Sequence, residues 1–431
     1  MTQMIKHLNE EFFTKNRVNL FNEILPNSIV ILFSAEQFPK NGDQYYKYRQ
    51  NSDTYYFSGM TQEDTVVMLH KDENSDKFQE FAFIIEPNQK MITWTGYKYS
   101  KKDASNISGI KDVEFHENFE SVFKNVTSKI KHLYFSHKSN VRGIQYQNSL
   151  FNQWSKKNKN VIDKLEVIDL DPHSMKLRLQ KAPEEQNTIQ KTIDITGETF
   201  LDLLKFVKPG VYEYQVEAEM LNGFFKRGAQ DYAYLPIVAS GKNNNILHYN
   251  TNRNICKEGD LLLLDFGAEL DYYAADLSRT IPISGKFTTR QREVYSAVLN
   301  VQKQMIKKII PGTTIRELNS ECEILIQDEL LKLKLISKYD IDSQNEENPA
   351  FKKYYMHGVS HFIGLDVHDV GKKDTPLIPG MFLSCEPAIY IAEEGFGIRL
   401  ENDILVSPNQ PIDMCKNIPI EADEIENLMN S

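Results

Sequence analysis

The stretch LLLLDFGAELDYYAADLSRTIPI, residues 261–283, decides the fold of the C-terminal half. Its four leucines predict a buried strand, which ends in Asp265. The next strand, expected over residues 272–283, contains Asp276, and a hairpin turning at Leu270-Asp271 sets the two acids opposite each other. Facing carboxylates on apolar strands repel each other and lose solvation, and a bound cation would reverse that cost. The pair therefore indicates a cation site.

A second pair of acids follows the same pattern further along the chain. Residues 381–391 and 396–406 predict two strands around the tip 392–395, in a register that sets Glu386 opposite Glu401. A slip of one residue in either hairpin would move an acid to the other face. One such acid is most simply a solvated surface residue, whereas four on two apolar hairpins indicate a shared site.

Histidines accompany these acids. Three of the ten, His357, His361 and His368, lie within residues 356–369, and His248 shortly precedes the first acid pair. Histidine is a common metal ligand and a general acid or base near neutral pH. Each one alone is more simply a hydrogen-bonded structural residue, but their clustering favours a role in the same site.

The donor set indicates the kind of metal. Four carboxylates with imidazole form an oxygen-rich site that suits Mn²⁺, Co²⁺, Zn²⁺ or Fe²⁺ and disfavours Cu(I). Four negative charges also balance two divalent ions, which together activate water for hydrolysis. The sequence has no Gly-rich phosphate loop and no GxSxG elbow that would indicate different chemistry.

Composition narrows the class of protein. With 431 residues, 41% of them hydrophobic and 26% charged, the chain is typical of a globular protein of about two domains. A net charge of −10 without a long basic run argues against nucleic acid as a partner. No apolar run is long enough for a membrane span or a signal peptide, so we expect a cytoplasmic protein. The four scattered cysteines predict neither a disulfide framework nor a thiolate metal site.

The order of predicted elements divides the chain near residue 175. Before it, β-rich runs at 28–33, 65–69, 81–85 and 132–135 alternate with helical stretches and predict a smaller α/β domain over residues 1–174. A break at Asp171-Pro172-His173 precedes a long helix that starts at Pro183. In residues 175–431 a helix, a Pro-Gly stop and a second helix occur twice, at 209–210 and 311–312, which hints at a duplication or is ordinary helix punctuation.

The motifs resemble the aminopeptidase P branch of the methionine aminopeptidase, prolidase and creatinase superfamily. The resemblance covers most of the chain. Its N-terminal part rests on YRQNSDTYYFSG at 48–59, a segment that methionine aminopeptidases typically lack. Its C-terminal part rests on these motifs: ILHY at 246–249, DFG at 265–267, DLSRT at 276–280, MHG at 356–358, HDVG at 368–371, PGM at 379–381, EP at 386–387 and GIRLEND at 397–403.

The resemblance implies an α/β (α+β) protein with a smaller N-terminal creatinase-like domain and a C-terminal pita-bread catalytic domain. It implies two divalent ions, Mn²⁺ before the others, and a homo-oligomer, dimer or tetramer. The implied metal ligands are Asp265, Asp276, His361, Glu386 and Glu401, with Asp276 and Glu401 bridging. The other implied roles are substrate contact for His248, His357 and His368, support for Arg399, and a pocket position for Tyr390. Ala388 departs from the glycine of many relatives but removes no ligand.

The expected activity is that of a metallo-aminopeptidase that removes a residue preceding proline. A metal-bridging hydroxide would attack the carbonyl, Glu386 would move the proton to the leaving nitrogen, and His368 would stabilise the oxyanion. Peptides with proline in second position would be the substrates. Two alternatives stay open: a prolidase that cleaves Xaa-Pro dipeptides, and a non-catalytic binding protein on the same fold.

Overall fold

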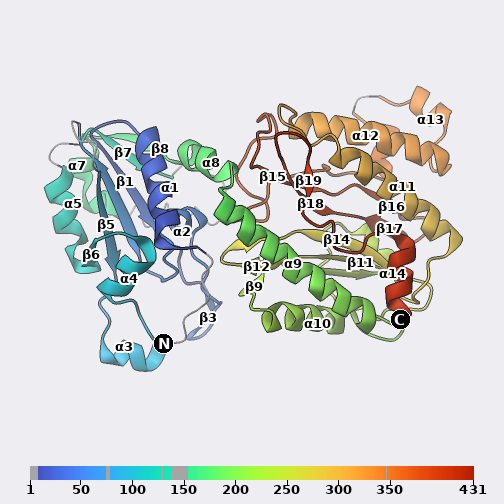
Figure 1. Cartoon of the computed structure of the whole chain (residues 1–431), viewed down its shortest axis with the longest axis horizontal. Coiled ribbons are helices and arrows are strands. Elements are labelled where there is room, and N and C mark those ends of the chain that lie inside the picture. The colour runs from blue at the N-terminus through green and yellow to red at the C-terminus, as the bar shows by residue number, and fades with distance from the viewer. Residues whose placement is uncertain (1–7, 74–77, 128–129, 137–153, 346) are drawn as a thin grey trace. The chain divides into compact units, whose positions relative to one another are not determined.

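The computed structural model describes residues 8–73, 78–127, 130–136, 154–345 and 347–431. These residues fall into two compact units, Met1–Arg178 and Leu179–Ser431, and both mix helices with sheets, as expected (Figure 1). The sequence predicts a break between elements at residues 171–173, and in the structure the helix α8, Asp171–Leu179, begins there. Pro172 lies in its first turn, where a missing N–H costs no helical hydrogen bond. The domain limit at 174/175 stays a proposal.

The first unit is built on a six-stranded mixed sheet in the order β6-β5-β4-β1-β7-β8. Its central strand β1 pairs antiparallel with β4 and parallel with β7. All six residues of β1 are buried, because helices cover both faces of the sheet: α5 and α7 on one face, and α1, α2 and α4 on the other (Figure 1). The strands are β1 Ser28–Phe33, β4 Val66–Lys71, β5 Phe78–Ile84, β6 Asp112–Phe115, β7 His132–Phe135 and β8 Glu166–Asp169. The helices are α1 Glu10–Glu23, α2 Ser52–Ser58, α3 Gln89–Thr95, α4 Lys101–Ser108, α5 Phe119–Thr127 and α7 Lys159–Ile162.

The second unit holds its strands between two pairs of helices (Figure 1). The first pair, α9 Pro183–Phe206 and α10 Glu213–Lys226, is joined through Gly210, and the second, α11 Thr289–Ile306 and α12 Ile315–Lys332, through Gly312. Both glycines have positive φ, 94° and 92°, which explains the Pro-Gly stops. The predicted layout of helix, Pro-Gly stop and helix therefore occurs twice in the second unit, once in each helix pair. The last helix, α14 Ala422–Met429, packs on α9 and α11.

The strands of this unit form short ladders. One sheet has the order β10-β11-β14, a second β13-β12-β9 and a third β15-β18-β19, while β16 pairs with β17. Their bounds are β9 Asp231–Tyr232, β10 Ile237–Ser240, β11 Leu261–Phe266, β12 Ala268–Leu270, β13 Tyr273–Ala274, β14 Leu277–Pro282, β15 Phe382–Cys385, β16 Ala388–Ile391, β17 Phe396–Arg399, β18 Asn402–Leu405 and β19 Ile412–Asp413.

The first hairpin differs from the predicted register. Leu270 pairs with Tyr273, so the turn lies at Asp271-Tyr272, whose φ values of 46° and 68° are those of a type I′ turn. As a result Asp265 pairs with Ser278, two residues beyond the predicted partner Asp276. A shift of two keeps the same face of the strand, so both acids still point to the same side.

The second hairpin has the predicted register on both sides of the acid pair. Cys385 pairs with Asn402, and Ala388 pairs with Arg399. Glu386 and Glu401 lie in the gap between these two ladders. The ladders on either side therefore hold Glu386 and Glu401 opposite each other, although these two residues do not belong to either ladder.

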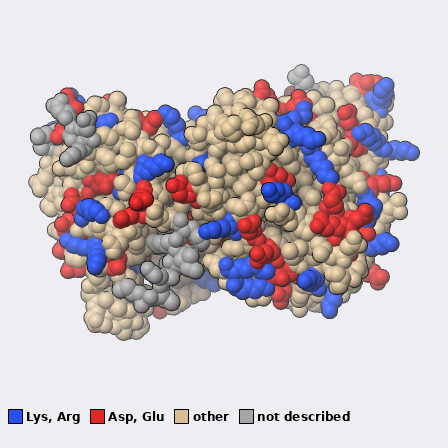
Figure 2. Space-filling model, viewed as in Figure 1, with Lys and Arg blue, Asp and Glu red and all other residues tan. Residues whose placement is uncertain are grey.

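Charges of both signs are interspersed over the face of the protein seen in Figure 2, without an extended basic surface on that face. None of the described helices combines the length and the apolar character that a bilayer crossing requires.

Candidate metallopeptidase active site

A pocket of about 610 Å³ in the second unit is lined by every predicted site residue except Tyr390. The predicted residues in its wall are His248, Asp265, Asp276, His357, His361, His368, Glu386, Arg399 and Glu401. Apolar side chains, among them Leu235, Ile237 and Leu247, complete the wall. Acids therefore share one cavity with histidines and an apolar surface.

Each of the four acids lies where a ladder of strand hydrogen bonds ends or is interrupted. Asp265 lies near the end of β11, and Asp276 lies between β13 and β14. Gly267 makes this second position possible, because a Cβ at residue 267 would lie 1.7 Å from the carbonyl oxygen of Ala275. The close approach fixes the backbone directly before Asp276.

Three side chains form a tight donor cluster. Ligand atoms of Asp276, His361 and Glu401 lie within 4.8 Å of one another. The His361 Nε2 atom is 3.3 Å from Asp276 Oδ2 and 3.6 Å from Glu386 Oε1. His361 Nδ1 is 3.1 Å from the Phe362 carbonyl oxygen, a contact in which it can only donate. Burial lowers the pKa of His361, but the contact with Asp276 and the charge of Glu386 outweigh it and raise this pKa to about 9. A cation that displaces the Nε2 proton would leave the ring with its hydrogen on Nδ1. That is the tautomer a metal ligand needs.

The electrostatics of the cluster fit a cation. Burial, followed by repulsion from Asp276, Glu386 and Asp265, raises the pKa of Glu401 well above its usual range. Burial also raises the pKa of Glu386 to about 7 and raises the pKa of Asp265. Glu401 Oε1 is buried and has no hydrogen-bond partner among the residues that the structure describes. A divalent ion would supply both the missing partner and the missing positive charge.

Arg399 lies behind Asp265 and organises this side of the pocket. Its Nη2 donates to Asp265 Oδ2 at 2.5 Å, its Nη1 to the Tyr390 hydroxyl at 2.8 Å and its Nε to Ser278 Oγ at 2.9 Å. Tyr390 also contacts His357 Nε2 at 3.0 Å. Tyr390 is therefore joined to the pocket through these two residues, although it does not line it.

The remaining histidines lie around the acids. Burial lowers the pKa of His357 to about 4, so its ring is neutral at pH 7. The ring of His368 lies 4.4 Å from that of His361, and burial followed by the charge of His361 lowers the pKa of His368. His248 lies in an exposed stretch of the pocket wall.

Three further residues contact the acids and were not predicted. The Tyr234 hydroxyl lies 2.6 Å from Asp265 Oδ1 and 2.5 Å from Asp276 Oδ1, and Ser278 Oγ donates to Glu401 Oε2 at 2.8 Å. Asp403 accepts from the Asp276 N–H at 3.0 Å. Asp403 is an acid followed by two apolar residues in the short strand β18, and it lies two residues after Glu401, on the same face of the strand. The sequence already contained this signal. Tyr234 has no such signal.

Comparison with known proteins identifies the family. The profile of metallopeptidase family M24 matches residues 187–408, and that of the aminopeptidase P N-terminal domain matches residues 13–134. The chain belongs to metallopeptidase family M24. All ten predicted site residues of this M24 metallopeptidase lie within the first match, and the expected two-domain fold is confirmed. Family membership also makes it a hydrolase that uses divalent metal.

Individual relatives resemble this M24 metallopeptidase over their full length. An Xaa-Pro aminopeptidase of Haemophilus influenzae is 32% identical over 98% of both chains, and one of Escherichia coli is 31% identical over 99% of both. A structure of zinc-substituted Escherichia coli aminopeptidase P in complex with product has a TM-score of 0.90 at 29% identity and covers 99% of both chains.

Proposed function

We propose that this M24 metallopeptidase is an Xaa-Pro aminopeptidase, which hydrolyses the peptide bond between an N-terminal residue and a following proline. The observation that carries the proposal is that the four acids and the four histidines His248, His357, His361 and His368 line one and the same pocket. The full-length similarity to relatives called Xaa-Pro aminopeptidase supports the substrate class. Peptides with proline in second position are the proposed substrates.

Five residues are proposed to hold two divalent ions: Asp265, Asp276, His361, Glu386 and Glu401, with Asp276 and Glu401 shared between the ions. Four carboxylates balance the charge of two such ions. Glu401 Oε1 is a potential metal ligand atom that has no hydrogen-bond partner among the described residues. We propose Mn²⁺ first, while Co²⁺, Zn²⁺ and Fe²⁺ also accept these donors. When bound, the ions activate water for hydrolysis and polarise the scissile carbonyl.

The side chains of the pocket complete the reaction. Glu386 takes a proton from the attacking water and passes it to the proline nitrogen as the C–N bond breaks. His368, kept neutral by burial, donates an N–H to the carbonyl oxygen as negative charge develops there. Arg399 and Tyr390 hold Asp265 in place.

The acids also explain the selection of a free N-terminus. A substrate amine is protonated at neutral pH and should bind near the proposed metal carboxylates. A peptide bond within a longer chain has no such charge. The enzyme therefore acts as an exopeptidase.

The test is a comparison of kcat/KM for Arg-Pro-Pro, Gly-Pro and Met-Ala-Ser under identical metal conditions. We expect Arg-Pro-Pro to be cleaved fastest, because the pocket receives the pyrrolidine ring and the chain beyond it. A preference for Gly-Pro would make the protein a prolidase, and a preference for Met-Ala-Ser would make it a methionine aminopeptidase. Absence of turnover in metal-loaded protein would favour the non-catalytic alternative.

Assembly and location belong to the same proposal. We expect a dimer or tetramer, which light scattering of the eluting protein would measure directly. We also expect a cytoplasmic protein, which fractionation of the source cell would test.

A further inference from the structure

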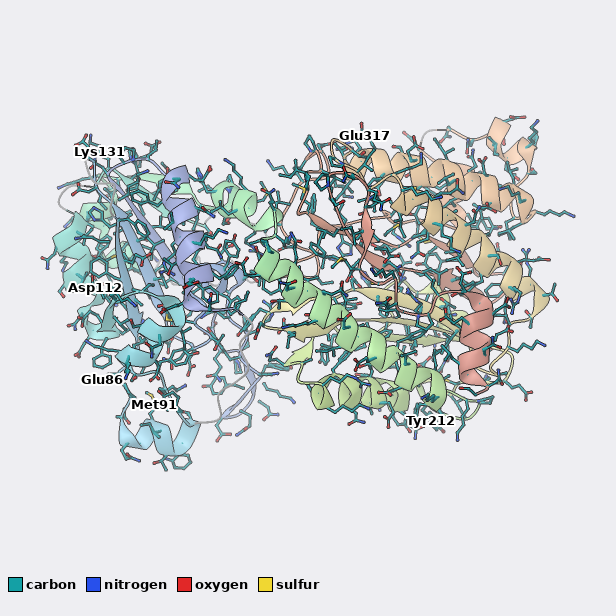
Figure 3. All side chains as sticks on the ribbon, in the orientation of Figure 1. Glu86, Met91, Asp112, Lys131, Tyr212 and Glu317 are labelled. Atoms are coloured by element: carbon teal, nitrogen blue, oxygen red, sulfur yellow. The ribbon has the colours of Figure 1, made fainter. Side chains whose placement is uncertain are left out.

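The carboxylate of Glu213 is fully buried at the first residue of α10. Figure 3 labels its neighbour Tyr212 at this end of the helix. Glu213 Oε1 accepts from the N–H and the hydroxyl of Ser240, at 2.8 and 2.7 Å, and from Asn243 Nδ2 at 3.4 Å. Its Oε2 accepts from the Tyr249 hydroxyl and from the Asn254 N–H, each at 2.8 Å.

All of these donors come from a single stretch of chain, residues 240–254. A buried carboxylate loses its hydration, and charge-assisted hydrogen bonds replace it only if the donors stay in place. The dependence is mutual. The donors of residues 240–254 stabilise the buried carboxylate of Glu213, and their hydrogen bonds to this carboxylate hold the segment in one conformation. Glu213 is therefore the common anchor of a segment that has little regular structure apart from the turn of 3-10 helix at Gly241–Asn245.

The anchored segment is also a wall of the pocket. Leu247, His248 and Asn250 line the cavity, and His248 and Asn250 are exposed on either side of the less exposed Tyr249. In this segment the Ile246 N–H donates to the Asn243 carbonyl at 2.9 Å, and the Tyr249 N–H donates to the Ile246 carbonyl at 3.3 Å. The bond between Tyr249 and Glu213 is thus the direct link between the wall at His248 and the buried anchor.

We propose that Glu213 and Tyr249 are positioning residues, which hold the His248 wall in the conformation that binds the peptide. The inference rests on the proposed aminopeptidase function and deepens it. Neither residue lines the pocket, so both act through their neighbours. Burial, followed by the hydrogen bond to Glu213, raises the pKa of Tyr249 to about 12, so its hydroxyl remains a donor throughout the working pH range.

Loss of this bond should affect substrate binding more than the chemical step. If the wall spends only a fraction of its time in the binding conformation, the apparent affinity is the intrinsic affinity multiplied by that fraction. The acids are held by contacts with Arg399, Tyr234 and Ser278 that do not involve Tyr249 or Glu213, so bound substrate reacts at nearly the same rate. For Tyr249→Phe we expect KM for Arg-Pro-Pro to rise about tenfold, with kcat within about twofold of the parent.

Tyr295→Phe is the matched control. Tyr295 is buried in α11, its hydroxyl donates to the Ile420 carbonyl at 2.7 Å, and it does not line the pocket. Its removal deletes one tyrosine hydrogen bond elsewhere in the same unit, so KM should stay at the parent value. An unchanged KM in Tyr249→Phe, an equal rise in both variants, or a fall in kcat alone would overturn the proposal.

A second readout separates this inference from the proposed function. Hydrogen exchange of the amides of residues 244–250 should become faster in Tyr249→Phe and remain slow in Tyr295→Phe, whether or not the protein cleaves Arg-Pro-Pro. If the parent protein does not cleave this peptide, the function fails while the exchange result still tests the anchor. Equal exchange in the parent and Tyr249→Phe would contradict the anchor itself.

Discussion

Glu401 is buried beside Asp276 and His361, yet its Oε1 atom accepts no hydrogen bond from any described residue. Buried polar atoms are normally satisfied, and carboxylates this close repel each other unless a cation lies between them. Ser278 and Tyr234 each supply a hydroxyl to the cluster but no charge. The arrangement is therefore complete only with metal.

Asp276→Asn should lower metal occupancy. The substitution keeps the shape of the side chain but removes a negative charge from a proposed shared ligand, so the two ions are no longer balanced. Elemental analysis after equilibration with Mn²⁺ should show markedly less metal than in the parent. Asp423→Asn is the control, since the Asp423 side chain is 83% exposed. Parent-like occupancy in Asp276→Asn would contradict the assignment.

His368→Ala should separate catalysis from metal binding. His368 lies 4.4 Å from His361 but outside the tight donor cluster of Asp276, His361 and Glu401. We expect kcat to fall by about 10² or more, the usual loss for one oxyanion donor, with metal content nearly unchanged. His361→Ala should instead lose metal. Near-normal turnover of His368→Ala would exclude its role.

At the level of elements, the two hairpins show what the sequence can and cannot determine. The register around Glu386 and Glu401 was predictable because the apolar pattern continues evenly on both sides of the tip. The register around Asp265 was wrong by two residues, because the turn uses positive φ at both Asp271 and Tyr272. Asp adopts this conformation more readily than most residues, whereas a bulky residue such as Tyr272 rarely does, so the sequence did not indicate this turn. Asp265 and Asp276 still point to the same face of the sheet, because a shift of two residues does not change the face of a strand residue.

Contacts between distant segments could not be predicted from local pattern. Tyr234 reaches Asp265 and Asp276 from the loop after β9, and Glu213 reaches Tyr249 from the start of a helix. Neither residue stands in an alternating or helical pattern that marks it for such a partner. Only the folded chain brings these groups together.

Gly267→Ala should damage the acid cluster through the backbone. The added Cβ would lie 1.7 Å from the Ala275 carbonyl oxygen, so the strand next to Asp276 has to move. We expect weaker Mn²⁺ binding, measured by calorimetry, together with a lower thermal midpoint. Unchanged Mn²⁺ affinity would show that the approach of the two strands does not fix Asp276.

A buried ion pair supports the loop that carries the histidines. Lys181 Nζ lies 2.9 Å from Asp369 Oδ2, both side chains are 1% exposed, and Asp369 directly follows His368. Asp369→Ala leaves the lysine charge buried and should cost about 3–5 kcal/mol of stability. Asp374→Ala, at an exposed pair with Arg316, should leave the stability nearly unchanged, because solvent screens that pair. Equal thermal midpoints for the two variants would contradict this reading.

At the scale of the whole molecule, the chain joins an aminopeptidase P N-terminal domain to an M24 domain that contains every proposed site residue. The order of domains and the α+β class follow from the sequence motifs alone. The pocket itself depends on the interrupted strands of two hairpins, β11 to β14 and β15 to β18, and on the loop of His361 and His368. Its chemistry is therefore a property of the folded second unit.

The most direct test of the central claim is mass spectrometry of the products formed from Arg-Pro-Pro by metal-loaded protein. The proposed activity predicts equal amounts of free arginine and Pro-Pro, no product after chelation, and restored product on addition of Mn²⁺. Release of Arg-Pro and proline, or cleavage that persists in protein shown to be free of metal, would contradict it.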